Sequence, residues 1–448
     1  MILRHPVVAL AATAGWLLLT TGYGAAAAEP GVDLGGAPLP NGRGSADPTN
    51  PTVIEAGLWA DTLGAGASDG EVHHFTYRRT MQDSTVHIGV IGAPTAAGSG
   101  TVTVDVLDPD EDSCASDYDS PDYAVPEAVF GASVVVGPDE PDDRESACLT
   151  AAELDFTITR SNGEEGDLPI AIKVLEEATP SAEGLEELPG EPRYDVGSPG
   201  GDAAEVAGAA SFDDAPEVTP GDPGAVVTTT IPEGEERLWN VPVGWGQGLS
   251  AVAEVPAVDP SGLSEEDASE LTYTAPGVDL RVIGPDRDSI NVGRDDAVNT
   301  GDYGTDPLTL EVATVPVNYL NRFEGRRPTL PGDFWVAVAV EDLPPDAARD
   351  RVDVPVELTI AVTDGPDGAP TYPGTVLSPD GEAGPADYDP ETPFLIGPDQ
   401  FSAVASDVPV LPGAEDDGWW GPRRYAGIGL AVASLVCCGL GVRRLLLR

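Results

Sequence analysis

The sequence predicts an all-β protein with two tandem antiparallel β-sandwich (jelly-roll-like) domains, a signal peptide before them and one C-terminal transmembrane helix after them. Short runs alternate apolar and polar residues at every second position, which is the period of a strand with one buried face. These runs are separated by segments rich in the 53 glycines and 44 prolines of the chain, and no amphipathic helical stretch competes with them. Three strand patterns also recur later in the chain in the same order.

The amino-terminal residues 1–28 have the organisation of a secretory signal peptide. Arg4 precedes an apolar run from Pro6 to Leu19, and four alanines end the segment just before Glu29. A basic start, an apolar centre and small residues at the cleavage point are typical of a segment that is removed on export. We therefore expect a mature chain that starts at Glu29 with a disordered leader over residues 29–51.

Near the other end of the chain, Tyr425 to Val442 form 18 residues without a charge. As a helix this segment reaches about 27 Å, close to the thickness of a bilayer core. With an exported amino-terminal body, it predicts a single-pass protein in the cell membrane, with the body outside the cell and a basic tail, residues 443–448, inside. Leu411–Glu415 resembles a sortase signal but has Ala and Glu where that signal has Thr and Gly, so membrane retention is preferred over attachment to the cell wall.

Three pairs of segments indicate that the exported body contains a duplicated domain. The pairs have offsets of 186, 178 and 176 residues, in the order Leu168–Val174 with Val354–Ile360, Asp155–Thr159 with Asp333–Ala337, and Val104–Asp110 with Leu280–Asp286. We place the first sandwich at residues 52–179 and the second at 222–366. Residues 180–221 are rich in Pro, Gly, Glu and Ala without an apolar period and predict a linker, and residues 367–424 predict an acidic stalk.

Each copy has six expected strands, bounded by turn-forming residues. In the first copy they are Gly57–Leu63, Glu71–Tyr77, Thr85–Ile91, Thr101–Leu107, Leu154–Thr159 and Leu168–Leu175. In the second copy they are Val226–Ile231, Arg237–Val243, Leu249–Val255, Val278–Ile283, Phe334–Val340 and Asp353–Val362. Pro169 and Pro355 stand second in equivalent strands. Because proline removes a backbone donor, each strand should begin there or lie at a sheet edge.

The charge balance excludes one class of partner. The chain has 77 acidic and 22 basic residues, for a net charge of −55. Such a field repels polyanions, so no nucleic acid is expected to bind. The same field favours solubility and could attract basic proteins or divalent cations.

Two cysteines, Cys114 and Cys148, lie in the exported part of the chain. An even number of cysteines outside the cytoplasm predicts a disulfide. It would close a loop of about 35 residues. By restricting the unfolded chain, it would stabilise the folded protein by about 3 to 4 kcal/mol. A structural staple is the preferred interpretation.

No catalytic motif is found in its required context, so we predict that the protein is not an enzyme. Gly66–Gly70 matches the Gly-x-Ser-x-Gly pattern around Ser68, but that chemistry needs a strand-to-helix elbow and a later histidine. The exported histidines are His73, His74 and His87, and His73 and His74 fall on opposite faces of one expected strand. We expect His87 on the polar side of its strand, and no zinc site, which needs three or four convergent ligands.

Calcium is the one cofactor that the sequence leaves open. Asp108, Asp110, Asp112 and Asp119 occupy positions 1, 3, 5 and 12 of an EF-hand-like count. The position that requires glycine is Ser113, and no flanking helices are expected. A solvated acidic loop is the preferred interpretation, with calcium bound by an irregular loop as the alternative.

Several motifs of the second copy resemble the pre-peptidase C-terminal type of β-sandwich, a module found beside secreted bacterial enzymes. They are Pro232–Glu235, Arg237–Val241, Asp279–Asp286 and Pro331–Val336. Ser211–Pro216 and Val241–Gln247 are similar to segments of exported single-anchor proteins of filamentous actinobacteria. The resemblance implies a surface accessory or interaction module without a catalytic residue.

These observations predict a non-catalytic cell-surface interaction or accessory protein that is anchored in the membrane by one helix. Its expected partners are the membrane and another envelope or secreted protein. A calcium- or glycan-binding adhesion module is the second hypothesis, and an enzyme with an unrecognised site is the third.

Overall fold

The computed structural model describes residues 31–406, apart from short internal segments. The gaps are 66–70, 95–99, 109–112, 122–123, 127, 139, 142–145, 163–165, 184, 186–191, 193–202, 222–223, 259–260, 262–263, 265–268, 270, 272, 291–297, 345–346 and 348. The predicted signal peptide and the predicted anchor, Tyr425–Val442, therefore lie outside the described residues. Within the described part of the chain, no helix is long and apolar enough to span a membrane.

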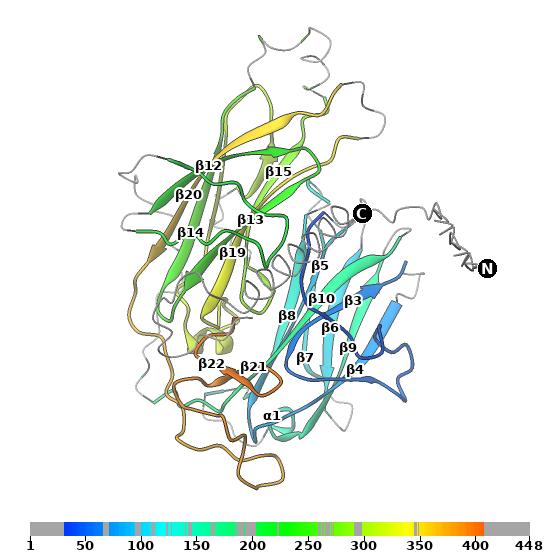
Figure 1. The fold of residues 1–448 in the computed structure, drawn as a ribbon, viewed down its shortest axis with the longest axis vertical. Coiled ribbons are helices and arrows are strands. Elements are labelled where there is room, and N and C mark those ends of the chain that lie inside the picture. The colour runs from blue at the N-terminus through cyan, green and yellow to red at the C-terminus, as the bar shows by residue number, and fades with distance from the viewer. Residues whose placement is uncertain are drawn as a thin grey trace, which may run out of the picture.

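The first sandwich consists of two facing sheets that share one core (Figure 1). One sheet has the order β1 (Ala37–Pro38), β3 (Gly57–Leu63), β10 (Leu168–Glu177), β5 (Thr85–Gly92) and β8 (Phe130–Val136), and β21 (Phe394–Gly397) with β22 (Gln400–Ser402) continues it beside β10. The other sheet has the order β2 (Thr52–Ile54), β4 (Glu71–Arg78), β9 (Glu153–Ser161), β6 (Thr101–Leu107) and β7 (Ser113–Asp119).

The second sandwich repeats this plan. One sheet has the order β11 (Ala204–Glu205), β12 (Ala225–Pro232), β20 (Asp353–Thr363), β14 (Gly248–Val255) and β18 (Leu308–Ala313). The other contains β13 (Glu236–Val243), β19 (Gly332–Val340) and β15 (Gly277–Ile283), with β16 (Ser289–Ile290) and β17 (Thr300–Asp302) beside β15. The order β3-β10-β5-β8 thus corresponds to β12-β20-β14-β18, and the three matched sequence pairs lie in corresponding strands.

Pro169 and Pro355 lie just before the residues at which their strands begin to pair with a second neighbouring strand. Pro169 pairs with Thr62 of β3, whereas the pairing of β10 with β5 begins one residue later, at Ile170. Pro355 pairs with Thr230 of β12, and the pairing of β20 with β14 starts at Glu357. The second set of strand pairings begins after each proline. The backbone N–H that proline lacks therefore costs that pairing no hydrogen bond.

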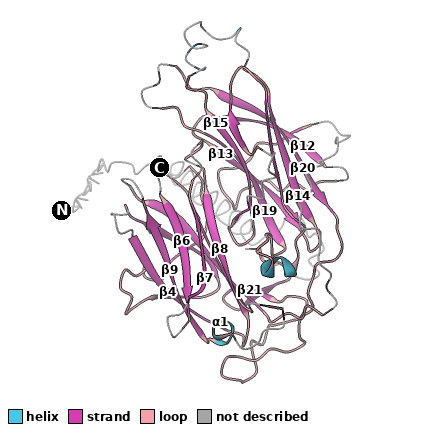
Figure 2. Ribbon diagram, turned by 180° about the vertical axis from the view of Figure 1, so that it is seen from behind, coloured by secondary structure: helices cyan, strands magenta, loops and turns pink. Residues whose placement is uncertain are grey.

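The sandwiches are stacked face to face, and this is the main feature that the sequence did not predict. The outer face of the β3-β10-β5 sheet packs on the outer face of the β13-β19-β15 sheet through an apolar cluster that includes Ile91, Ala171, Leu238, Ile283 and Trp335. Both sides of the inner strands are consequently buried, and every residue of β5 is buried. Figures 1 and 2 show the two sandwiches in this arrangement from opposite sides.

The described parts of the predicted leader, linker and stalk pack against the sandwiches instead of forming free coil. Val32 of the leader, Phe212 of the linker and Phe394 of the stalk are all nearly inaccessible to solvent. β21 pairs with the end of β10, so the stalk segment adds a strand to the first sandwich. Each segment contributes only one or two short apolar stretches, and such isolated contacts leave no period in the sequence.

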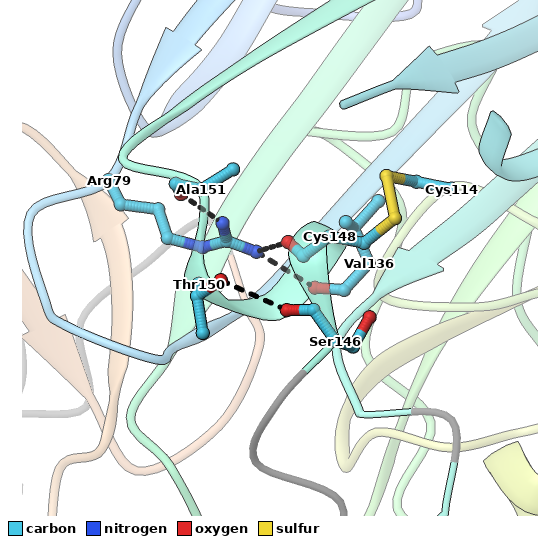
Figure 3. The surroundings of a disulfide bond; sticks show 7 residues. All are labelled: Arg79, Cys114, Val136, Ser146, Cys148, Thr150 and Ala151. Atoms are coloured by element: carbon cyan, nitrogen blue, oxygen red, sulfur yellow. Dashed lines mark hydrogen bonds between the residues drawn. A yellow bond between two sulfur atoms is a disulfide. The ribbon is translucent and has the colours of Figure 1, made fainter. Parts of the chain in front are cut away.

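The predicted disulfide between Cys114 and Cys148 is formed, with an S–S distance of 2.06 Å (Figure 3). It joins the edge strand β7 to the short helix α1 (Ala147–Thr150). The buried Arg79 guanidinium donates hydrogen bonds to the carbonyl oxygens of Cys148 and Ala151 beside it. Burial lowers the pKa of Arg79 to about 10. The disulfide and Arg79 together hold α1 against the sandwich.

Candidate functional site

The edge of β8 that does not pair with β5 is covered by side chains. Its contacts begin at Val129, the residue before the strand, whose N–H donates to Glu236 Oε2 at 2.9 Å. The Gly131 N–H contacts Asp119 Oδ2 at 2.8 Å and Ser289 Oγ at 3.0 Å, the Ser133 N–H contacts Asp117 Oδ2 at 3.3 Å, and the Ser133 carbonyl oxygen accepts from Arg327 at 2.6 Å. Three of these five side chains belong to the second sandwich. An uncovered edge strand can pair with a strand of another chain. Here charged and polar side chains, most of them from the second sandwich, cover the edge of β8.

A polar cleft of about 410 Å³ lies beside this edge, between the sandwiches. Arg327 bridges its walls, with contacts of 2.6 Å to Asp288 and 3.1 Å to Asp117. Burial raises the pKa of Asp288 well above its ordinary value, although the Arg327 charge opposes this. Burial also raises the pKa of Asp119 against the hydrogen bonds from Ser120 and Gly131. These charged groups are engaged with one another and with β8, so the cleft serves mainly to join the sandwiches.

The proposed calcium loop does not assemble as the sequence count suggested. Asp119 ends β7 opposite Val102, whereas Asp108 follows β6 at the other end of the hairpin. The antiparallel pairing of β6 with β7 therefore separates these two carboxylates by the length of a strand. Asp110 and Asp112 lie outside the described residues, and the described residues contain no group of three or more potential ligands that could hold a metal ion.

A turn of the second sandwich packs against the outer face of the sheet of the first. The Asp286 carbonyl oxygen approaches Gly89 of β5 so closely that a Cβ atom at Gly89 would lie 1.6 Å from it. Arg287 has a φ of 66° at this turn, and its guanidinium lies 4.1 Å from the Phe212 ring centroid and 4.3 Å from that of Trp335. Gly89 is therefore required for the close approach of the two backbones.

A second charged cluster joins the sandwiches around Glu177, at the end of β10. Its carboxylate accepts hydrogen bonds from Arg322 at 2.9 Å and from Tyr372 at 2.9 Å, and lies 3.0 Å from His87 Nε2. Burial alone would raise the pKa of Glu177, but the Arg322 charge and the His87 contact outweigh it and lower the pKa to about 2. Burial lowers the pKa of His87 despite this carboxylate. His87 lies on the polar side of its strand, opposite Val86 and Ile88, as predicted. That side is buried, however, because the second sandwich covers it.

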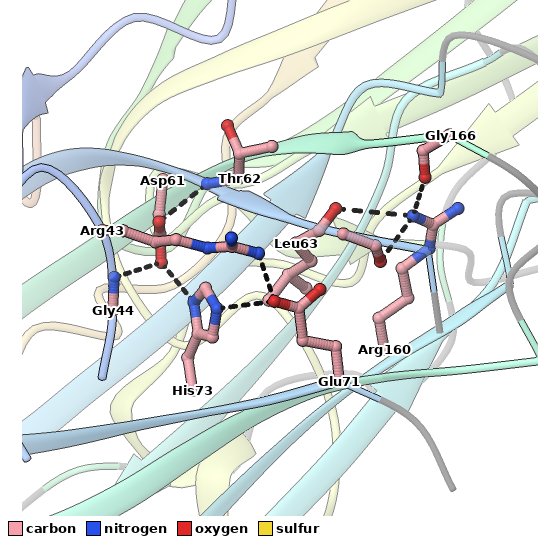
Figure 4. A network of polar contacts seen from close by, with 10 residues as sticks. Arg43, Gly44, Asp61, Thr62, Leu63, Glu71, His73, Arg160 and Gly166 are labelled. Carbon is pink, nitrogen blue, oxygen red and sulfur yellow. Dashed lines mark hydrogen bonds and ion pairs between the residues drawn. The ribbon is translucent and has the colours of Figure 1, made fainter. Parts of the chain in front are cut away.

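His73 lies in a buried network beneath the amino-terminal strap, by which we mean residues 31–50 (Figure 4). Its Nδ1 is 2.7 Å from Asp61 and its Nε2 is 3.2 Å from Glu71. Arg43 of the strap pairs with Glu71, and the Gly44 N–H donates to Asp61 at 3.1 Å. The network thus fastens the strap to the first sandwich. Ser68 of the Gly-x-Ser-x-Gly pattern lies outside the described residues.

Replacing Gly44 with alanine should release the strap. The new Cβ would lie 2.6 Å from His73 Nδ1, 2.7 Å from Phe75 and 2.8 Å from Asp61, so the strap must move. We expect a loss of about 2 kcal/mol in the free energy of unfolding and faster hydrogen exchange in residues 31–45. Gly374→Ala is the control, since no atom lies within 4 Å of a Cβ there. Unchanged exchange in the strap would contradict this role.

The outer face of the second sandwich carries a hollow of about 630 Å³ over β12, β20, β14 and β18. The strand register places Thr228, Glu357, Glu254 and Thr309 in one row across the four strands. We call this row, with its three flanking prolines Pro256, Pro307 and Pro355, the acidic sheet face. Glu254 and Glu357 are both exposed and directly opposite each other. Like charges opposite each other destabilise a sheet. Glu254 and Glu357 are therefore a candidate binding site for a partner.

Sequence reasoning missed this row because its two glutamates, Glu254 and Glu357, are more than a hundred residues apart in the sequence. Alternation alone places each glutamate on the outer face of its own strand. Only the pairing of β14 with β20 brings them together.

Comparisons with known proteins place the chain in no family. No family model matches it, and no match was found among curated proteins. Among solved structures, the N-terminal CBM22-1-CBM22-2 tandem domain of Paenibacillus barcinonensis Xyn10C overlaps 69% of this chain and 92% of its own, at 10% identity and a TM-score of 0.18. The ANX1 ectodomain of Arabidopsis thaliana overlaps 69% of this chain and 91% of its own, at 8% identity and a TM-score of 0.18.

Proposed function

We propose that the protein is a non-catalytic surface interaction protein that presents the acidic sheet face to a basic, extended segment of another envelope or secreted protein. The observation that carries the proposal is the exposed pair Glu254 and Glu357, opposite each other on β14 and β20. A positively charged side chain placed between them would relieve their repulsion. A negatively charged partner would not relieve this repulsion.

The composition of the hollow favours a protein segment over a glycan. Its described lining consists of threonine, glutamate, proline, leucine and valine, and contains no aromatic residue on which a sugar ring could stack. The prolines and threonines of this lining form a rigid surface of modest polarity. Glu254 and Glu357 supply the charge that would set the register of a basic partner.

The docked sandwiches would make this surface rigid. Because the inner sheet of the second sandwich is buried against the first, its outer sheet is the face left for a partner. The predicted signal peptide and the predicted anchor support a position outside the membrane, and the net charge of −55 would attract basic partners over several ångströms. In this proposal the first sandwich is a support and the second carries the recognition surface.

Reversing the charge of the pair tests the proposal. The variant Glu254→Lys/Glu357→Lys should recover at least about tenfold less partner than the wild type in a pull-down from the native envelope under mild crosslinking, because like charges then meet across the interface. The control Glu382→Lys/Glu391→Lys changes the same net charge at exposed positions elsewhere and should bind normally. Equal recovery by all three proteins, or no partner at all, would count against the proposal.

Calcium and soluble glycans are tested in the same samples. Heat on calorimetric titration of the wild type with calcium, lost in the charge-reversal variant, would favour the adhesion-module hypothesis instead. A soluble glycan that releases the captured material would have the same meaning.

A further inference from the structure

The interface between the sandwiches has one end at Val129, just before β8, where buried charges of the second sandwich hold the backbone of the first. The Val129 N–H donates to Glu236 Oε2 at 2.9 Å, and its carbonyl oxygen accepts a hydrogen bond from Arg281. Glu236 and Arg281 are each only 4% exposed. Both backbone groups of Val129 are therefore paired with side chains that are in place only while the sandwiches are docked.

The strand register explains why Glu236 lies in apolar surroundings. Glu236 of β13 and Asp279 of β15 both pair with Ala339 of β19, so the two carboxylates flank one alanine on the same face of the sheet. Ala339 packs in a small buried cluster with Val125 and Ala128 of the first sandwich. Docking therefore covers Glu236 with apolar side chains, and such surroundings disfavour its charged form.

The charges that face Glu236 do not balance. Arg281 is the cation that acts on it, but Arg281 also interacts with Asp279, at 2.5 Å, and with Asp119 of β7. One guanidinium therefore faces three carboxylates. The other charged groups beside the same small pocket form ion pairs of their own, Glu235 with Arg237 and Asp342 with Arg351.

The two oxygens of Glu236 have different surroundings. Oε2 accepts the Val129 hydrogen bond, whereas Oε1 has no hydrogen-bond partner among the described residues. A buried negative charge on an oxygen without a donor costs more free energy than a neutral hydroxyl group at the same place. Burial accordingly raises the pKa of Glu236 from 4.5 to about 7, against the Arg281 charge and the Val129 hydrogen bond.

We propose that docking of the two sandwiches takes up a proton at Glu236, so that the Val129 end of the interface is closed in mildly acidic surroundings and loosens in alkaline ones. The docked state favours the neutral form of Glu236. Its contribution to docking is therefore fully present below about pH 4.5 and is lost as the pH rises through about 7. The inference concerns the joint between the sandwiches and does not depend on the function proposed for the acidic sheet face.

His87, in the cluster around Glu177, responds to pH in the opposite direction. Burial lowers its pKa, so the stability that His87 contributes is fully present above about pH 6.5 and is lost as the pH falls. A comparison of the wild type with a variant at Glu236 removes this effect, because His87 is the same in both proteins.

Hydrogen exchange of the Val129 N–H in the full-length chain tests the proposal, because the acceptor of this amide belongs to the second sandwich. After correction for the intrinsic exchange rate, the equilibrium constant for opening of this amide should rise about tenfold from pH 6 to pH 8. The same opening constant at both pH values would overturn the proposal. This measurement needs only the wild type, so it does not depend on the folding of a variant.

Two substitutions assign the effect to Glu236. The variant Glu236→Gln is neutral at every pH and should have the same opening constant at pH 6 and pH 8, whereas the control Glu235→Gln should keep the tenfold rise. In urea denaturation, the wild type should lose about tenfold in its folding equilibrium constant relative to Glu236→Gln between pH 6 and pH 8, or about 1.4 kcal/mol. A tenfold rise in opening that survives in Glu236→Gln, or a stability difference that is independent of pH, would overturn the assignment.

Discussion

Replacing Gly89 with valine should separate the two sandwiches while each remains folded. Any Cβ at this position would lie 1.6 Å from the Asp286 carbonyl oxygen, and backbone on both sides leaves no rotamer that avoids the overlap. The Gly284–Asp288 turn must withdraw, and Arg287 then leaves its position between Phe212 and Trp335. We expect a loss of more than about 3 kcal/mol in the free energy of docking.

Urea denaturation followed by tryptophan fluorescence measures this effect. The wild type should unfold in a single transition, because the sandwiches share the buried cluster around Trp335 and Ile91. Gly89→Val should give two separate transitions. Gly374→Val is the matched control, since a Cβ there meets no atom within 4 Å, and it should behave as the wild type. A single transition of Gly89→Val at the wild-type midpoint would show that the turn does not dock on β5.

Replacing Glu177 with glutamine should weaken the same interface by about 3 to 5 kcal/mol, because it leaves the buried Arg322 guanidinium without its counter-charge. The effect should depend on pH. The pKa of Glu177 is about 2 in the folded protein, below its ordinary value of 4.5. The stability it contributes is therefore fully present above about pH 4.5 and is lost as the pH falls toward 2.

Free energies of unfolding of the wild type and of Glu177→Gln, measured from pH 7 to pH 2.5, test this prediction. The difference between the two proteins should shrink as the pH falls, which separates Glu177 from other carboxyls that titrate in both. Glu177→Gln combined with Arg322→Met should recover part of the loss, since neither charge is then buried alone. A difference that stays constant with pH would contradict the role assigned to the Glu177 charge.

The sequence predicted strands with one buried face, such as β6, and also strands that are buried on both faces, such as β5. The predictions Gly57–Leu63 and Thr101–Leu107 coincide with β3 and β6, although only Thr101–Leu107 alternates without interruption. β8 was missed, because its sequence Phe-Gly-Ala-Ser-Val-Val-Val does not alternate. Most residues of β8 are buried, since one side packs in the core and the other meets the second sandwich. Periodicity alone therefore does not find a strand such as β8.

The candidate sites were harder to predict, because each depends on residues brought together by docking or by strand register. Asp119 was assigned to a loop with Asp108, but it caps the Gly131 N–H of β8 instead. Glu236 accepts its hydrogen bond from Val129 of the other sandwich. Cys114 and Cys148 could be predicted because the other two cysteines of the chain, Cys437 and Cys438, lie in the predicted anchor. Contacts between the two sandwiches cannot be found in this way, because no count of residues in a single sequence shows which of them meet.

Small-angle X-ray scattering of residues 29–406 in solution tests whether the two sandwiches form one docked body. A compact chain of this size has a radius of gyration of about 21 Å, and we expect a value near this with a single-peaked distance distribution. A radius of about 30 Å or more, with a second peak from two separated domains, would contradict it. In that case the acidic sheet face would belong to a tethered domain and not to a rigid support.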